Sequence, residues 1–343
     1  FVLAWCWFFA TFLSLRTLAA IEKKRLMKLF KTTIFLILTL TLTFQTNVQA
    51  ETWDEPWQKE IIKKAEYFVL AEVINNDENI GAEVQIMKSF GNQKLDGKIL
   101  INGFSLLNMT SSSGHGVHLE FEKGQKVYLL LTKKKDGNFA IPTPTSGFAV
   151  LDDDKNVYAV YRHSYHMALV PQDIYEKTYT EIWNYFKTGK FDENNVMPFI
   201  NENIEKKPYG FEKEEISTFF LQHVALETAY LLDISIELNK LKKFVESDFF
   251  HSRVSALQLL SNSTSKETKE YLLNFISTEK EKDFETVIAI WSLAKIGGKE
   301  YKNKMLSIAD KISDKETGFG GNIMDPRVGT YFPSPRSAIK ELK

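Results

Sequence analysis

Residues 254–276, VSALQLLSNSTSKETKEYLLNFI, align without a gap with residues 287–309, VIAIWSLAKIGGKEYKNKMLSIA. The displacement is 33 residues, which is a typical length for a repeating unit made of two helices. Leu260 falls on Leu293 and Leu273 on Leu306, so the matched positions are ones expected in a core. A single helix pair cannot bury its apolar face alone, and such units therefore stack into a binding surface. The match predicts a helical C-terminal region built from repeats.

The helical pattern begins at Pro171. Apolar and aromatic residues recur at helical spacing from Ile174 to Phe186, and Gly189 follows as a C-terminal stop. Residues 196–204, 216–232 and 234–245 continue the pattern, and residues 338–342 read as a further helix. We therefore expect a helical connector at 171–215 and a repeat domain at 216–343. The segments RVSALQLL and VIAIWSLAKIGG resemble HEAT-like, armadillo-type repeats, which implies a short α-solenoid.

Residues 51–170 show a β pattern. The expected strands are 67–74, 82–87, 98–101, 125–132, 139–141, 147–151 and 157–161, separated by turn-forming residues such as Asp96-Gly97. Short strands without intervening helices are typical of a small antiparallel barrel or sandwich. The segments IIKKAEYFVLAEV, VQIMKSFGNQ and FEKGQKVYLLL resemble the netrin-like barrel of metalloprotease inhibitors, an OB-type fold. The fold class that we expect is thus α+β, in two domains.

That family's inhibitory mechanism does not carry over to this chain. In the metalloprotease inhibitors a mature N-terminal cysteine binds the protease zinc and disulfides hold that segment in place. Here the expected mature chain begins at Glu51 and has no cysteine, because the only one is Cys6. A barrel with loops remains as a general binding scaffold.

The N-terminal region reads as an export signal that starts at Met27. Lys28 and Lys31 form a basic segment, residues 34–44 an apolar segment, and Val48-Gln49-Ala50 a small-residue cleavage site. Residues 27–50 would then be the signal peptide, and residues 1–26 upstream DNA translated by mistake. The rival interpretation is a pair of membrane helices, which Arg16 and the short apolar run at 34–44 disfavour.

Charge and cysteine content restrict the partners. The first 50 residues hold six of the 43 Lys and Arg and one of the 44 Asp and Glu, leaving 37 basic and 43 acidic residues, net −6, from Glu51 onward. An acidic chain is poorly suited to phosphate backbones, so we expect no nucleic-acid partner. No cysteine follows the cleavage site to carry a lipid. These features predict a periplasmic or extracellular protein without a stable membrane span after cleavage, and not a lipoprotein.

Four histidines form two pairs, His115 and His118 in GHGVHL and His163 and His166 in YRHSYHM. Neutral imidazoles are common zinc and copper ligands, so two converging pairs could form a metal site. However, residues three apart on a strand point to opposite faces. We therefore interpret them as polar residues of a loop and a strand end, and keep the metal site as the alternative.

Two other segments supply candidate binding residues. Small polar residues at 110–116, TSSSGHG, suggest a loop that could carry binding function or merely connect strands. The Gly- and Pro-rich residues 318–335 hold many apolar side chains and are expected to fold back as a cap on the repeats. The candidate binding residues are Ser113, Arg162, Tyr165 and Arg327.

No catalytic motif of the GxSxG, HExxH, P-loop or GxGxxG type occurs in the sequence. The function that we expect is a non-enzymatic binding or assembly protein of the cell envelope, without a cofactor, whose partner is another protein or an envelope component. The alternatives are a metal-dependent enzyme or metal-binding protein centred on the histidine pairs, and a protease inhibitor acting through barrel loops.

Overall fold

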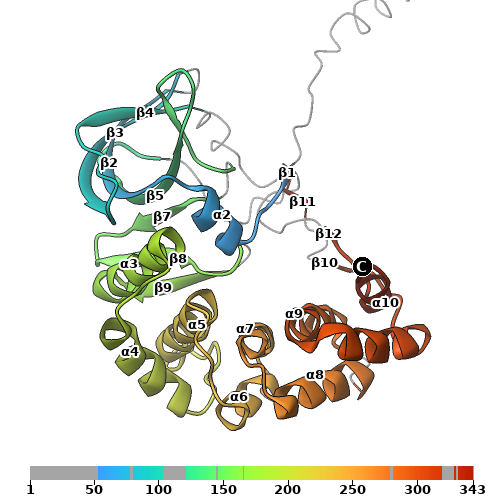
Figure 1. Ribbon diagram of the computed structural model, residues 1–343. Helices are drawn as coiled ribbons and strands as arrows, with labels where there is room; N and C mark the ends of the chain where they lie inside the picture. The colour runs from blue at the N-terminus through green and yellow to red at the C-terminus, as the bar shows by residue number, and fades with distance from the viewer. Residues whose placement is uncertain are drawn as a thin grey trace, which may run out of the picture. The chain divides into compact units, whose positions relative to one another are not determined.

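The computed structural model describes residues 53–77, 80–102, 121–143, 146–164, 166–278, 281–318, 328–329 and 331–342. By their contacts, all of the described residues belong to one compact unit, Thr52–Lys343. That unit is α+β, with a barrel and further strands in its N-terminal part and helices in its C-terminal part (Figure 1). None of the described helices is both long enough and apolar enough to cross a bilayer.

Five strands close into a small barrel in the order β2-β3-β4-β6-β5, with β5 pairing back onto β2. They are β2 (Tyr67–Asp77), β3 (Gly81–Phe90), β4 (Lys98–Ile101), β5 (Lys126–Lys133) and β6 (Phe139–Ala140). All of these pairings are antiparallel except β4 with β6, which is parallel at Ile101 and Phe139. The closure leaves β2 and β5 without a free edge in the barrel. The predicted small barrel is therefore present, and its strands match the predicted ranges to within a few residues.

Both faces of β2 and β5 are buried, which explains their unbroken apolar runs. Val69 and Leu129 point into the barrel, where they join a core with the other strands. Phe68 and Tyr128 point the other way, into a second core shared with the helices. Successive side chains of a strand alternate between faces, so a strand covered on both sides must be apolar at every position.

A meander continues the sheet beyond β5. It consists of β7 (Phe148–Leu151), β8 (Asn156–Val160) and β9 (Met167–Pro171), joined in antiparallel fashion. The strand β9 was not predicted, because its five residues directly precede a strong helical pattern. Helix α3 (Gln172–Thr188) packs against β8 and β9, and helix α2 (Gln58–Lys64) packs against β5 and α3. Gly189 ends α3 with φ of 72°, as its position in the sequence predicts.

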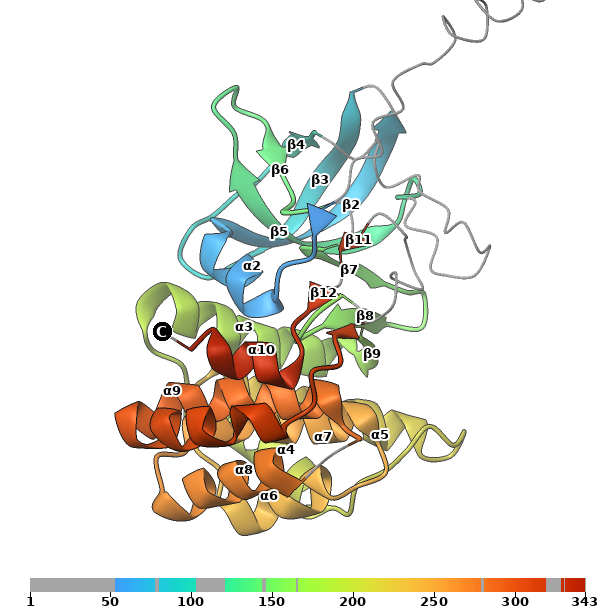
Figure 2. The same ribbon diagram turned by 90° about the vertical axis from the view of Figure 1, so that its right-hand side faces the viewer.

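The remaining helices follow one another along the chain. They are α4 (Glu193–Glu205), α5 (Ile216–Leu231), α6 (Leu238–Val245), α7 (Phe250–Leu259), α8 (Lys266–Thr278), α9 (Asp283–Ile308) and α10 (Pro335–Lys340), with short 3₁₀ turns at Leu260–Asn262 and Ala309–Lys311. Helices α5, α7 and α9 pack on one another, and α4, α6 and α8 lie on one side of this row (Figures 1 and 2). The helical region therefore has two layers.

The 33-residue match corresponds to real structural equivalence. Helix α7 begins at Phe250 and α9 at Asp283, which are 33 residues apart. Helix α8 begins at Lys266, and its counterpart is Lys299, directly after the sharp corner that Gly298 makes in α9 with φ of 61° and ψ of −164°. Five matched pairs are fully buried at both positions: Val254 and Val287, Ala256 and Ala289, Leu257 and Ile290, Leu260 and Leu293, and Leu272 and Met305. The repeat seen in the sequence is thus a repeat of core positions.

One member of a predicted core pair is wrong. Leu306 is 42% exposed, whereas its equivalent Leu273 is half-buried and packs against the main core. Each of them directly follows a fully buried residue, Met305 or Leu272, and neighbours along a helix are turned by about 100°, so neither shares that residue's face fully. The sequence alignment placed the equivalent residues correctly but did not show that Leu306 faces solvent.

The C-terminal segment returns to the start of the unit. β11 (Val328–Gly329) pairs in parallel with β1 (Trp53–Asp54), and β12 (Tyr331–Phe332) pairs with β10 (Thr317–Gly318). The ring of Phe332 stacks on Phe284 of α9 at 4.1 Å between centroids. Helix α10, capped by Ser334, then packs on α9. The part of the predicted cap at 319–327 lies outside the described residues.

Candidate functional site

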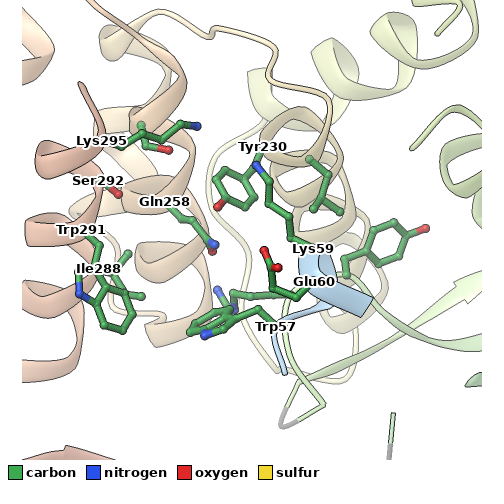
Figure 3. Close-up of a pocket in the computed structure, with 13 residues that line it drawn as sticks. Trp57, Lys59, Glu60, Tyr230, Gln258, Ile288, Trp291, Ser292 and Lys295 are labelled. Carbon is green, nitrogen blue, oxygen red and sulfur yellow. The ribbon is translucent and has the colours of Figure 1, made fainter. Parts of the chain in front are cut away.

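A pocket of about 250 Å³ lies between α2, the end of β8 and the row of helices α5, α7 and α9 (Figure 3). Because segments far apart in the sequence supply its walls, the fold itself assembles it. It is lined by Trp57, Lys59, Glu60, Tyr161, Arg162, Tyr230, Leu231, Gln258, Ser261, Ile288, Trp291, Ser292 and Lys295. The lining combines aromatic rings with charged and amide groups, as is usual where a small molecule is held and oriented.

Two tryptophans form one wall of this pocket. The rings of Trp57 and Trp291 meet edge to face, with centroids 6.4 Å apart and planes at 84°. Phe332 from the C-terminal segment packs against both, at 6.3 Å from Trp57 and 4.7 Å from Trp291. His163 contacts Trp57 from a further side at 5.4 Å. These contacts hold Trp57 in place although it precedes a helix of only seven residues.

Two lysines share one carboxylate at another side of the pocket. The ammonium groups of Lys59 and Lys295 lie 3.9 Å and 3.4 Å from Oδ1 of Asp233, and Tyr185 donates to the other oxygen at 2.8 Å. Both ammonium groups also lie over the ring of Tyr230, at 5.1 and 5.7 Å. Burial lowers the pKa of Lys59, Asp233 opposes this, and the charge of Lys295 lowers it further. The two ammonium groups are thus balanced by Asp233 and, more weakly, by Glu60.

Arg162 links the pocket to a buried polar cluster. Its side chain and that of Glu227 are both fully buried and form an ion pair at 3.3 Å. Arg162 also donates to the hydroxyl of Ser255 at 3.0 Å and to Nδ1 of His251 at 3.0 Å. Ser255 donates to Glu227 at 2.5 Å. Burial raises the pKa of Glu227, while Arg162 and then the Ser255 hydroxyl act to lower it.

Three histidines complete this cluster, from the loop before β9 and from helices α5 and α7. The ring of His166 lies 4.0 Å from that of His223 and stacks on His251 at 3.8 Å, measured between centroids. Ser255 uses its proton on Glu227, so His223 must donate to Ser255 through Nδ1. The buried Nε2 of His223 then has no hydrogen-bond partner. The buried Nε2 of His166 has none either.

The histidines are held in the neutral form. Burial lowers the pKa of His163 to about 4 and that of His251 to about 3, in both cases with help from the charge of Arg162. Burial also lowers the pKa of His166 and His223 well below the usual value, with neighbouring histidines and Arg162 adding to the effect. A positive charge on any of these rings would face Arg162 in a dry environment.

The predicted site residues are only partly brought together. Arg162 lines the pocket. His163 and His166 lie in the loop between β8 and β9, as polar residues of a loop and a strand end, and they are buried, at 8% and 5% exposed. Nε2 of His163 donates to the carbonyl oxygen of Glu55 at 3.0 Å. His115, His118, Ser113, Tyr165 and Arg327 lie outside the described residues.

The described side chains do not form a metal site. Within these ranges no group of three or more His, Cys, Asp or Glu residues is arranged to hold a metal ion, the three clustered imidazoles included. The pair His115 and His118 is not part of that search, because it falls outside the described ranges.

Most of the pocket residues were not predicted, although the repeat contained a usable signal. Gln258 and Trp291 occupy equivalent positions 33 residues apart, and both line the pocket. Asn262 and Lys295 are also equivalent, and Nζ of Lys295 donates to Asn262 at 3.0 Å. In these two pairs, positions whose residue type differs between the repeats lie in or beside the site. Trp57, Lys59 and Glu60 gave no such signal.

No protein-family model, no curated protein and no solved structure matches this chain. The fold and the site therefore define its class by themselves. It is an α+β protein in which a five-stranded barrel and a two-layered helical region enclose a small pocket lined by aromatic and charged residues.

The buried histidines predict a fold that is sensitive to acid. Since their pKa values are lower in the folded than in the unfolded state, the unfolded chain binds more protons below about pH 6.5. The free energy of unfolding should therefore fall as the pH drops, by about 1.4 kcal/mol per pH unit for each histidine until its folded pKa is reached. Urea denaturation at pH 7, 6 and 5 measures this.

The matched variant for this measurement is His223→Asn, whose amide can still donate to Ser255. It should be less stable at pH 7 but show a shallower dependence on pH, because one of the titrating groups is gone. Equal unfolding free energies of the parent protein at pH 7 and pH 5 would contradict the assignment of neutral, buried imidazoles.

Proposed function

We propose that this protein is an exported, non-enzymatic binding protein of the cell envelope that holds a small envelope component in the pocket between α2, α5, α7 and α9. The observation that carries the proposal is the pocket itself, which combines fixed aromatic walls with unlike charges. Rigid aromatic surfaces supply contact area at low entropic cost, and a few polar groups orient the ligand.

The surrounding charged groups favour binding over chemistry. Arg162 and Glu227 neutralise each other, and Ser255 donates to that same carboxylate. Ser255 is therefore an acceptor for Arg162 and a donor to Glu227, which is the arrangement of a structural network rather than of an activated nucleophile. Such a network fixes the wall behind the pocket.

The family resemblances fit this proposal. A netrin-like barrel supplies a closed scaffold, and HEAT-like helix pairs supply a stacked surface. The equivalence of α7 and α8 with the two parts of α9 supports the repeat interpretation of residues 216–343. In this proposal Gln258 and Trp291, which occupy equivalent positions of the two repeats, contact the ligand.

Export is the second part of the proposal, and the leader supports it. The basic Lys28 and Lys31, the apolar residues 34–44 and the small residues at 48–50 have the order of a cleaved signal. Placing the protein in the envelope gives the pocket access to envelope components. This part predicts Glu51 as the first residue of the exported form.

The proposal is tested on the protein recovered from the exported fraction. Mass spectrometry of its N-terminal peptide should give Glu51. Thermal unfolding is then followed with a library of small envelope components, and at least one should raise the melting temperature of the parent protein, since a ligand at a hundred times its Kd stabilises by about 2.7 kcal/mol. Trp291→Ala should abolish that shift, whereas Lys64→Met, an exposed change on α2, should keep it.

Two results would contradict the proposal. A stabilising compound that acts equally on the parent and on Trp291→Ala binds somewhere other than this pocket. A protein that keeps residues 27–50 in the recovered fraction is not exported by cleavage at Ala50.

A further inference from the structure

The pocket is small, which limits the size of its ligand. Its volume of about 250 Å³ lies just below the range of roughly 300–1,000 Å³ that is typical of sites for drug-sized molecules. Trp291 is 36% exposed, so the pocket is open to solvent at that wall. The ligand therefore has about the size of a single amino acid, and it can enter from outside.

One side of the pocket suits a carboxylate. Lys59 and Lys295 both lie within 4 Å of the single carboxylate of Asp233, and two cations over the ring of Tyr230 repel each other. Tyr185 already donates to the second oxygen of Asp233. A ligand carboxylate between the two ammonium groups would reduce this repulsion, and the partial burial of Lys59 strengthens the attraction.

Another side suits an ammonium group. The carboxylate of Glu60 points into the pocket (Figure 3), and its ion pair with Lys63 at 3.0 Å joins two side chains that are each about half exposed, a kind of pair worth little. Gln258 lines the same part of the pocket, and its buried side-chain Oε1 has no hydrogen-bond partner. A buried acceptor without a partner is costly, so the Gln258 amide gains by turning toward a ligand N–H in the pocket.

The apolar wall suits a large side chain. Trp57 and Trp291 are held at right angles by Phe332, and Ile288 lies on the same side of the pocket as Trp291 (Figure 3). Aromatic and aliphatic groups pack well against such rings. A ligand with both charges but no apolar body would leave this wall uncovered.

We propose that the pocket binds a free α-amino acid with a large apolar side chain, its carboxylate between Lys59 and Lys295, its ammonium group on Glu60 and Gln258, and its side chain on Trp57 and Trp291. This inference rests on the proposed function, because it names the ligand class of the same pocket. Helix α2 contributes to both charged ends, together with α9 for the carboxylate and with α7 for the ammonium group.

Calorimetric titration of the exported protein tests this inference with four compounds. L-phenylalanine and L-leucine carry both charges, N-acetyl-L-phenylalanine lacks the ammonium charge, and L-phenylalaninamide lacks the carboxylate. We expect the two amino acids to bind and each blocked compound to bind at least about tenfold more weakly, the effect of one charge-assisted hydrogen bond.

Variants assign each end of the ligand. Lys295→Met should weaken L-phenylalanine about tenfold and remove the discrimination against the amide, whereas Glu60→Gln should remove the discrimination against the N-acetyl compound. Lys64→Met, also a change on α2 but exposed and outside the pocket, should bind as the parent protein does. Circular dichroism confirms that each variant is folded.

The outcomes separate this inference from the proposed function. A blocked compound that binds as tightly as L-phenylalanine overturns the amino-acid assignment, and if Trp291→Ala abolishes its binding the pocket remains a binding site. If neither amino acid binds but another compound stabilises the parent and not Trp291→Ala, the ligand class is also wrong while the proposed function stands. Binding that survives in Trp291→Ala overturns both.

Discussion

Replacing Arg162 by methionine is expected to lower the free energy of unfolding by about 3 to 5 kcal/mol, the largest effect that we expect from a single change. The side chains of Arg162 and Glu227 are fully buried and pair with each other, although the two residues are 65 positions apart in the sequence. Removing the guanidinium leaves a buried carboxylate without its counter-charge, and also takes hydrogen bonds from Ser255 and His251. Urea denaturation at pH 7 measures the loss.

A double variant separates the buried charge from lost packing. Arg162→Met combined with Glu227→Leu should recover much of the stability, because an apolar pair of similar volume removes the unpaired carboxylate. Lys206→Ala, which breaks a half-exposed ion pair with Glu202 on α4, is the control and should change the unfolding free energy by about 0.5 kcal/mol or less. A loss in Arg162→Met no larger than in this control would show that the buried pair is not formed.

Truncation of Leu293 to alanine is expected to cost about 2 to 5 kcal/mol, and truncation of its equivalent Leu260 a similar amount. Both side chains are fully buried in the core that joins α7 to α9, so each change leaves a cavity. Leu306 provides the control, since it lies in the second part of α9, after the corner at Gly298, and is 42% exposed. Leu306→Ala should cost less than about 1 kcal/mol.

The comparison tests the helical register directly. Chemical denaturation of the three variants gives the order of the losses, with Leu260 and Leu293 well above Leu306. Similar losses at Leu293 and Leu306 would mean that the second part of α9, after the corner at Gly298, is turned differently from the arrangement described here.

Much of the secondary structure could be read from the sequence, because it depends on local periodicity. The barrel strands show as short runs of β-branched and aromatic residues between turns, and the two-sided burial of β5 shows as VYLLL without a polar break. The end of α3 shows as Gly189. By contrast, β9 was hidden because five residues next to a long amphipathic helix give too little pattern of their own.

The repeat contains both features that the sequence predicts and features that it does not. Its core positions could be aligned from the sequence, since Leu260 and Leu293 must both be apolar to be buried. The side that faces the pocket could not, because Gln258 and Trp291 share a position but not a chemistry. The exposure of Leu306 was likewise missed, as an exposed leucine is common and gives no signal.

The sequence by itself determined the barrel strands, the helices and the 33-residue equivalence, because each of these follows from side chains close together in the chain. Only the tertiary structure decided the pocket, the pairing of Arg162 with Glu227, and the meeting of His166 with His223 and His251. These groups come from a strand end, α2 and the helices α5, α7 and α9, and nothing local links them. They converge because the barrel and the helical layers share one apolar core, and burial of that core sets which polar groups are enclosed together.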